Sequence, residues 1–501
     1  MPLQKRKRRS VSHIGHIIKS SSYRIVANIA TIIISISFMA YFARVFTLEQ
    51  MAVYATLTIL ATWNDTLSSL GLVTLVIKDA APLVAGGQIE RAKRLISSVL
   101  VYRTISLFLL CLLWMALGSF LHLEIFDSTE LADLISIIIW ISFAISCRST
   151  VGSIQISLQK FISREVINVV TVLCQRTLCV FGFILYGVPG FYWGFLLATL
   201  FGLGLGMVDI RSYLTFRLTS FSRIFHDSRS YFGLELLRSG LDNLDRPVIA
   251  LFLGAEALAG YHVAKRLYEN FSALIIAIVV PAGVKFGELK SAGTGVLKEY
   301  YRNCMIFITQ FFIPLGFFLA VISPQLLLLY GGEKYLPNTP VLIAFSFTFI
   351  GAALWTTLRE AALRLLSPKH IAYQYVISTV VTMIGYLILL PTVGAWGIPV
   401  AMGFGYFAGL LPLLKPLKKE WGLQMPLRNF FTATGAGVSV SLTAIPLFLI
   451  DNVVSQLVVA STLAGAIYIT WLIWVGPVEA GNFLRKLGLR IRSASLTLFS
   501  S

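Results

Sequence analysis

The chain has 501 residues, of which 57% are hydrophobic and only 13% are charged, and its mean hydropathy is +0.80. Because a soluble domain carries about 25% charged residues, this composition excludes a water-soluble protein and predicts a membrane protein. The formal net charge is +18, but the basic residues stand between apolar segments, which argues against nucleic acid as a partner.

The N-terminal tail, residues 1–24, is basic and contains the run KRKRR from Lys5 to Arg9. The apolar run that follows, Ile25 to Ala43, is long enough to span a bilayer, and no short apolar region with a small-residue cleavage site precedes it. We therefore predict an uncleaved signal anchor.

Fourteen apolar segments follow one another along the chain, each close to the roughly 20 residues that a helix needs to cross the hydrocarbon. They predict an all-α polytopic membrane protein of about fourteen transmembrane helices. The predicted spans are 25–43, 51–77, 99–121, 133–151, 166–186, 191–210, 231–253, 261–282, 303–323, 340–362, 371–391, 397–414, 429–449 and 457–475.

Basic residues alternate between the connections as the positive-inside rule requires. Both tails (1–24 and 478–501) and every second connection are rich in Lys and Arg, whereas the other connections offer only Arg44 and Lys334. This alternation predicts an inner-membrane protein with both termini in the cytoplasm.

Features of a catalyst are missing from the sequence. The outer connections are short, the longest being residues 323–339, which argues against a membrane-embedded glycosyltransferase because such an enzyme needs an external domain. Paired carboxylates suited to acid–base catalysis, a P-loop and a zinc spacing are absent, and the five cysteines have no metal-ligand spacing. We expect no enzymatic activity, no cofactor and no metal site.

A stripe of small residues recurs 203 positions later in the chain, which predicts an internal repeat. Four-residue spacing places each stripe on one helix face, where small residues allow close helix packing. The repeat predicts an N-terminal lobe (25–216), a cytoplasmic linker (217–230), a parallel C-terminal lobe (231–419) and two further helices within 428–477. The two stripes are Gly194, Ala198, Gly202 and Gly206, and Gly397, Ala401, Gly405 and Gly409.

The stretch DRPVIALFLGAEALAGYHVAKRL, from Asp245 to Leu267, resembles the seventh-span signature of the polysaccharide transporter family, which includes the O-antigen flippases. Glu49 and Tyr54 near the end of the first span, and LYGGEKYLPNTPVL from Leu329 to Leu342, fit the same family. The resemblance implies a MATE-like bundle of two six-helix lobes around a central cavity, with two extra C-terminal helices. It also implies a polyprenyl-diphosphate-linked oligosaccharide as the transported molecule.

Charged residues inside the predicted spans cost about 2.5–3.5 kcal/mol each at the bilayer centre, so they line a cavity or pair with one another. Five of them, on the seventh span, occupy one arc of about 100°, and Pro247, which lacks a backbone donor, is expected to kink the helix there. These five are Glu235, Arg238, Asp242, Asp245 and Arg246.

The resemblance implies that basic residues of a central cavity bind the diphosphate and sugars. Acidic residues are candidates for ion coupling or gating pairs, with H+ or Na+ as the ion. A structural alternative, in which the deep acids and bases only pair with each other, stays open. The candidate ligands are Arg176, Arg246, Lys265 and Arg266, and the candidate acids are Asp65, Asp242 and Glu269.

The function predicted is therefore that of a flippase for a polyprenyl-diphosphate-linked oligosaccharide, an O-antigen or other polysaccharide repeat unit. Its expected partners are that lipid, membrane lipids, a coupling ion, and the polymerase or export machinery. An ion-coupled multidrug or organic-cation antiporter of the same superfamily is the alternative, although such antiporters typically have twelve spans.

Overall fold

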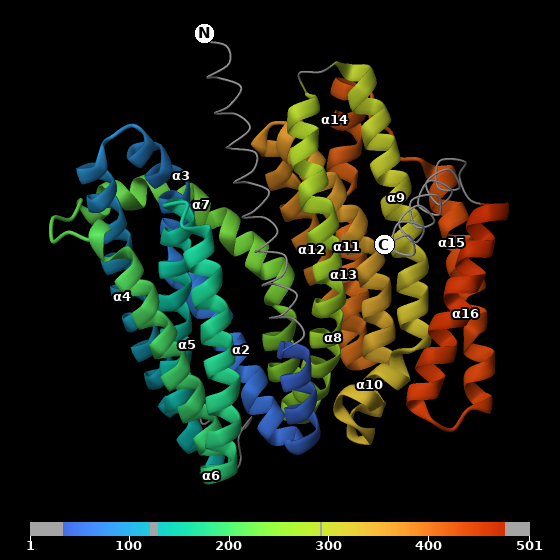
Figure 1. The fold of residues 1–501 in the computed structure, drawn as a ribbon, viewed down its shortest axis with the longest axis horizontal. Helices are drawn as coiled ribbons and strands as arrows, with labels where there is room; N and C mark the ends of the chain where they lie inside the picture. The colour runs from blue at the N-terminus through green and yellow to red at the C-terminus, as the bar shows by residue number, and fades with distance from the viewer. Residues whose placement is uncertain (1–33, 121–128, 291–292, 476–501) are drawn as a thin grey trace, which may run out of the picture. The chain divides into compact units, whose positions relative to one another are not determined.

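The computed structural model describes residues 34–120, 129–290 and 293–475, and these ranges are helical without any strand (Figure 1). Residues 25–33 of the predicted first span and both predicted tails lie outside them. After a first helix, Ile34–Val45, the elements are α2 (Leu48–Ser69), α3 (Leu72–Ala85), α4 (Ile89–Phe120), α5 (Thr129–Ser157), α6 (Phe161–Ile210), α7 (Phe221–Asn243), α8 (Asp245–Leu289), α9 (Thr294–Val321), α10 (Ser323–Gly331), α11 (Thr339–Leu365), α12 (Pro368–Val393), α13 (Gly397–Ala408), α14 (Leu411–Trp421), α15 (Leu427–Ser441) and α16 (Val453–Trp474).

The expected all-α membrane fold is confirmed. Eight helices within the described ranges are long and apolar enough to cross a membrane, or nine if α2 and α3 form one bent span. Three of the eight segments are 45 to 54 residues long, about twice the length that one span needs. Each of these three covers parts of two predicted spans, so the helix content agrees with a count of about fourteen.

Glycines with positive φ divide two of these long segments into hairpins. Gly187 has φ 65° inside α6, and Gly394 has φ 73° between α12 and α13, a conformation that glycine adopts without steric cost. The two arms of α6 then run against each other, because a Cβ on Gly190 would collide with the backbone of Gly182. The predicted boundary between the fifth and sixth spans therefore coincides with a real turn.

The two small-residue stripes are buried and serve helix packing, as their spacing predicted. A Cβ on Gly202 would collide with Thr171 on the first arm of α6, and one on Gly206 would lie 2.8 Å from the side chain of Val151 in α5. The second stripe packs in the same way, and a Cβ on Gly405 would collide with Thr382 of α12.

The second predicted span, 51–77, is bent by 59° where α2 gives way to α3. Leu70 and Gly71 have φ 46° and 74° at this break. Helix α7 packs directly against it, since the Ser228 hydroxyl donates a 2.8 Å hydrogen bond to the Leu70 carbonyl oxygen. A Cβ on Gly71 would lie 2.7 Å from the backbone nitrogen of Phe232 and would collide with the backbone of Ser228.

Gly71→Ala is therefore expected to destabilise the protein by more than the roughly 1–2 kcal/mol that a left-handed alanine costs, because α7 must also move. Gly87→Ala is the matched control, since Gly87 has φ 72° but a Cβ there would meet no atom within 4 Å. The measurement is the thermal unfolding midpoint of the purified protein in detergent. Equal losses for the two variants would contradict the packing argument.

The seventh predicted span is not the continuous helix that the shared arc of five charges required. Helix α7 ends at Asn243 and α8 begins at Asp245, so a break at Leu244 separates Asp245 and Arg246 from the charges of α7. Pro247 lies in the first turn of α8, where a missing N–H costs nothing. A second break follows at Gly254, with φ 82°.

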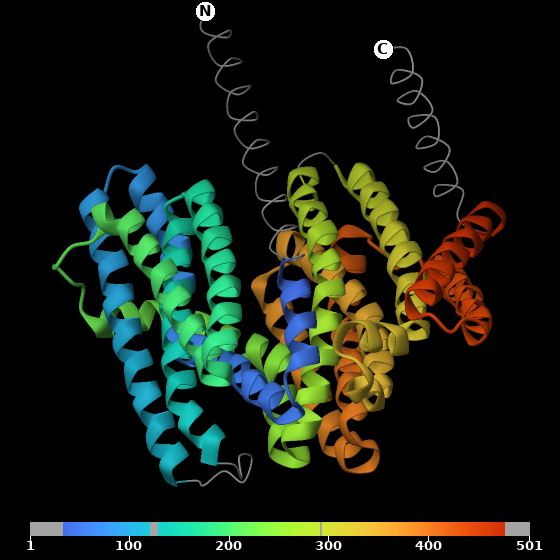
Figure 2. The same cartoon turned by 60° about the horizontal axis from the view of Figure 1, so that its bottom comes forward.

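The chain divides by its own packing into two compact units, residues 1–259 and 260–501. In unit 1, α7 packs on α2 and α3, and α4, α5 and the second arm of α6 share the apolar cluster around Leu75 and Val99. In unit 2, α11 is the central helix, and most of its residues are buried. Helices α15 and α16 lie side by side (Figure 2). The lobe boundaries suggested by the repeat stay predictions.

Candidate functional site

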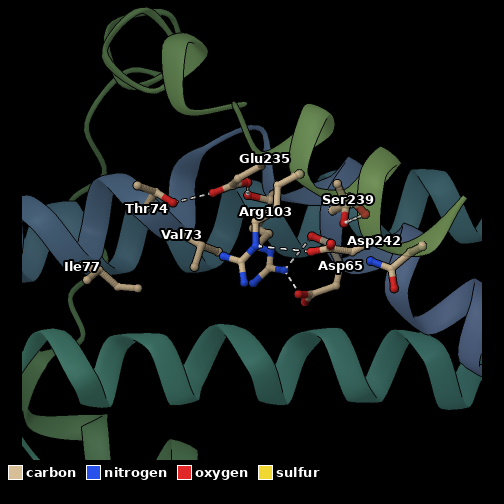
Figure 3. A pocket seen from close by; sticks show the side chains of 12 residues that line it. Asp65, Val73, Thr74, Ile77, Arg103, Glu235, Ser239 and Asp242 are labelled. Carbon is tan, nitrogen blue, oxygen red and sulfur yellow. Dashed lines mark hydrogen bonds and ion pairs between the residues drawn. The ribbon is translucent and has the colours of Figure 1, made fainter. Parts of the chain in front are cut away.

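A polar cavity of about 410 Å³ lies in unit 1 between α2, α3, α4 and α7 (Figure 3). Its volume is within the range of roughly 300–1,000 Å³ that ligand sites occupy. The lining residues are Asp65, Thr66, Ser69, Val73, Thr74, Ile77, Arg103, Glu235, Arg238, Ser239, Asp242 and Asn243.

The buried centre of this site is Arg103, whose side chain is 1% exposed. Its Nη2 donates to Asp65 Oδ1 at 2.5 Å and to the Asp65 carbonyl oxygen at 3.0 Å, and its Nη1 donates to Thr150 Oγ1 at 2.6 Å. The Asp65 carboxylate also accepts a 3.4 Å hydrogen bond from Ser149 and is 41% exposed. The arginine is thus held from α2 and α5, while its carboxylate partner faces the cavity.

Glu235 is held differently, by hydroxyl groups alone. Thr74 Oγ1 donates to Glu235 Oε1 at 2.5 Å (Figure 3), and Ser69 Oγ donates to Oε2 at 2.5 Å. These two donors stand on opposite sides of the break between α2 and α3. Among the described residues, no lysine or arginine pairs with this carboxylate. Glu235 is therefore the carboxylate of the cavity that is held by neutral donors, with no ion pair among the described residues.

On α7, Arg238 Nε lies 3.9 Å from Asp242 Oδ2, and both side chains are well exposed. An exposed pair of this kind contributes little stability. The lining then holds three carboxylates and two guanidinium groups. This balance favours a proton or a small cation over an anionic diphosphate.

The structure brings together two of the predicted acids, Asp65 and Asp242, in this cavity. The third, Glu269, lies in unit 2, where Arg266 Nη1 approaches its carboxylate at 3.2 Å. Arg103 and Glu235 were not among the candidate site residues. Arg103 stands inside the predicted span 99–121, and a basic residue within an apolar span is the signal that could have identified it.

The four predicted diphosphate ligands do not line this cavity. Arg176 lies on the first arm of α6, with its guanidinium 4.0 Å from the ring centre of Phe38, and its buried Nε and Nη1 atoms have no hydrogen-bond partner among the described residues. Arg246 is buried in the first turn of α8. Lys265, also buried, and the half-exposed Arg266 belong to unit 2. Their common role as ligands stays a prediction.

Comparison with known families decides the relationship of the chain. The sequence model of a family described as polysaccharide biosynthesis protein matches residues 41–340, more than half of the chain. The chain belongs to this family. The matched segment contains every residue that lines the 410 Å³ cavity and all seven candidate site residues. No curated protein matches the sequence.

Solved structures of transporters share the fold of this polysaccharide biosynthesis family member. The lipid II flippase MurJ, in an inward closed conformation, has a TM-score of 0.72 at 14% identity, covering 92% of this chain and 98% of that chain. An inward-facing multidrug resistance MATE family transporter of the MOP superfamily has a TM-score of 0.60 at 14% identity, covering 78% and 94%. A mutant of the Vibrio cholerae MATE transporter VcmN has a TM-score of 0.55 at 15% identity, again covering 78% and 94%. The expected MATE-like fold is confirmed.

Proposed function

We propose that this protein is a flippase that carries a polyprenyl-diphosphate-linked oligosaccharide, a polysaccharide repeat unit, from the cytoplasmic to the outer leaflet by alternating access. The observation that carries the proposal is membership of the polysaccharide biosynthesis family over residues 41–340. The structural likeness to MurJ over 92% of the chain supports it, because MurJ is named as a flippase of lipid II.

The multidrug antiporter alternative has weaker support. The MATE structures above cover 78% of this chain, whereas the flippase structure covers 92%, so its likeness includes more of the chain. Among the described residues that line the cavity in unit 1, only Val73 and Ile77 are apolar and none is aromatic, whereas aromatic faces are what attract an organic cation.

In the proposed mechanism the charges of unit 1 have separate roles. The carboxylates Asp65, Glu235 and Asp242 bind a proton or Na+ in the cavity between α2 and α7. Arg176, stacked on Phe38 with two nitrogens that have no partner in the described part of the chain, offers donors to an anionic group of the cargo. Arg246, Lys265 and Arg266 complete the proposed ligand set, and the prenyl tail stays in the lipid.

Transport itself is tested with the purified full-length protein in proteoliposomes that contain a polyprenyl-diphosphate-linked oligosaccharide. We expect the lipid to become accessible to a non-permeant external reagent faster than in protein-free vesicles. Export of an organic cation without movement of the lipid would favour the antiporter instead.

The proposed orientation places both termini in the cytoplasm and the protein in the inner membrane, in contact with polymerase or export machinery. Reporter fusions at Ser10 and Ser500 are expected to give only cytoplasmic signals, because basic residues concentrate on that side. A fusion in the connection at residues 331–338 is the control and is expected to give a periplasmic signal. A periplasmic signal from either terminus would overturn the orientation.

A further inference from the structure

A second cavity in unit 1, of about 210 Å³, lies between α5 and α6 and differs in charge from the first. Among the residues that the structure describes, two arginines and no carboxylate line it, whereas three carboxylates and two arginines line the larger cavity. Each polar side chain that lines it carries an N–H or O–H group that can donate a hydrogen bond. These are Arg148, Arg164, Ser149, Ser153, Gln155 and Asn168.

The two helices hold these arginines in a reciprocal arrangement. From α5, Arg148 Nη1 donates a 3.2 Å hydrogen bond to the carboxamide oxygen of Asn168 on α6. From α6, Arg164 reaches back to α5, where a Cβ on Gly152 would lie 3.6 Å from its Nε. Because residues four apart share a helix face, Arg148 stands one turn from Gly152, and Arg164 one turn from Asn168. Both guanidinium groups therefore face the same small space.

Their charges are incompletely compensated by the protein. Arg164 Nη1 pairs with Glu165 at 2.6 Å, and Glu165 does not line the cavity. Arg148 has only the neutral carboxamide of Asn168 as a hydrogen-bond partner in the part of the chain that the structure describes. A guanidinium inside a membrane segment is costly without an opposite charge, so a site of this kind is suited to an anion.

We infer that Arg148 and Arg164 form a binding site for a phosphate or diphosphate group between α5 and α6. Guanidinium forks match phosphate oxygens with paired, charge-assisted hydrogen bonds. The cavity is smaller than the roughly 300 Å³ at which ligand pockets usually begin, which suits a phosphate headgroup and excludes an oligosaccharide.

Two kinds of molecule present a phosphate or diphosphate group to a membrane protein. One is the diphosphate of the lipid-linked cargo, a source that rests on the proposed function, and the other is the headgroup of an anionic phospholipid. The site adjoins the first cavity, since Ser149 lines the smaller one and donates a 3.4 Å hydrogen bond to Asp65 of the larger one. An anion bound here would thus lie next to the carboxylates proposed for ion coupling.

The test measures binding by the full-length protein purified in detergent, with two probes. Equilibrium dialysis with labelled inorganic pyrophosphate reports diphosphate binding, and native mass spectrometry reports phosphatidylglycerol retained in competition with phosphatidylcholine. In Arg148→Gln/Arg164→Gln we expect affinity to fall by about tenfold or more for each charge-assisted hydrogen bond that the substitutions remove. Arg217→Gln, which removes one exposed charge from unit 1, is the matched control and is expected to bind like the wild type.

Ser153→Asp is a second variant that tests the site if the double arginine variant fails to fold. It adds a carboxylate to the cavity and leaves both arginines in place with a new partner, so it is expected to fold and to lose binding. Pyrophosphate binding that depends on the arginines assigns the site to the diphosphate, and dependence seen only for phosphatidylglycerol assigns it to a lipid headgroup. Binding of both probes unaffected by the arginine and Ser153 variants, or absent from the wild type, would overturn the site. None of these results depends on transport, so a failure of the flippase proposal would be seen separately.

Discussion

Asp65→Ala is expected to destabilise the protein by up to about 3–5 kcal/mol, the cost of leaving a buried charge without its partner. The arginine left behind is 1% exposed, and only the Thr150 hydroxyl and the carbonyl of residue 65 would still accept its hydrogen bonds. The reverse change, Arg103→Met, is expected to cost less. It leaves the Asp65 carboxylate, which is 41% exposed to the cavity and keeps its hydrogen bond from Ser149.

The double variant Asp65→Ala/Arg103→Met removes both charges and is expected to recover most of the stability of the wild type. Membrane abundance and the thermal unfolding midpoint in detergent are the measurements. If Asp65 also binds the coupling ion, the double variant recovers abundance without transport. If the pair is only structural, it recovers both. A loss for Arg103→Met as large as that for Asp65→Ala would contradict the asymmetry in burial.

The second large effect concerns membrane potential. A dianionic diphosphate that leaves a negative interior gains about 4.6 kcal/mol per 100 mV, twice the value for one charge. At 30 mV the gain is about 1.4 kcal/mol, so the ratio of outer to inner lipid in proteoliposomes is expected to shift about tenfold. The measurement is external accessibility of the lipid under a K+ diffusion potential. No response to voltage would contradict the movement of a charged cargo.

Ion coupling adds a separate response to pH. If one proton moves inward for each lipid moved outward, lowering the outer pH by one unit adds about 1.4 kcal/mol, again about tenfold. Glu235→Gln is expected to abolish this pH response and keep only the voltage response of the two lipid charges, because Glu235 is the cavity acid without an ion-pair partner among the described residues. Glu90→Gln, at an exposed carboxylate near the start of α4, is the control. A pH response that survives in Glu235→Gln would remove this residue from the coupling site.

The fold followed closely from local features of the sequence. The α6 hairpin could be predicted from two apolar runs on either side of Gly187, and both stripes of small residues pack as their four-residue spacing indicated. The break between α2 and α3 escaped prediction because the predicted span 51–77 runs across Leu70 and Gly71 as one segment. The break at Leu244 likewise lies inside a span that hydropathy alone presents as continuous.

The candidate site was predicted only in part. Asp65 and Asp242 were recognised because a carboxylate within an apolar span is conspicuous, and both line one cavity. Arg103 was missed since it stands only four residues into its predicted span, where an arginine can be taken for an interfacial residue. The separation of Arg176 from that cavity could not be seen from helix periodicity, which orders residues around one helix and gives no distance to another.

The sequence by itself determined that this chain is a membrane protein with about fourteen helical spans, because hydrophobic length and backbone hydrogen bonding in lipid are properties of each segment alone. Only the tertiary structure decided which charges meet. Asp65 finds Arg103 from another helix, and Glu235 is held by Ser69 and Thr74 more than 150 residues away. Such pairs depend on how helices cross and bend. The break at Leu70–Gly71 lies between Ser69 and Thr74, and these two hydroxyl groups donate to the two oxygens of the Glu235 carboxylate.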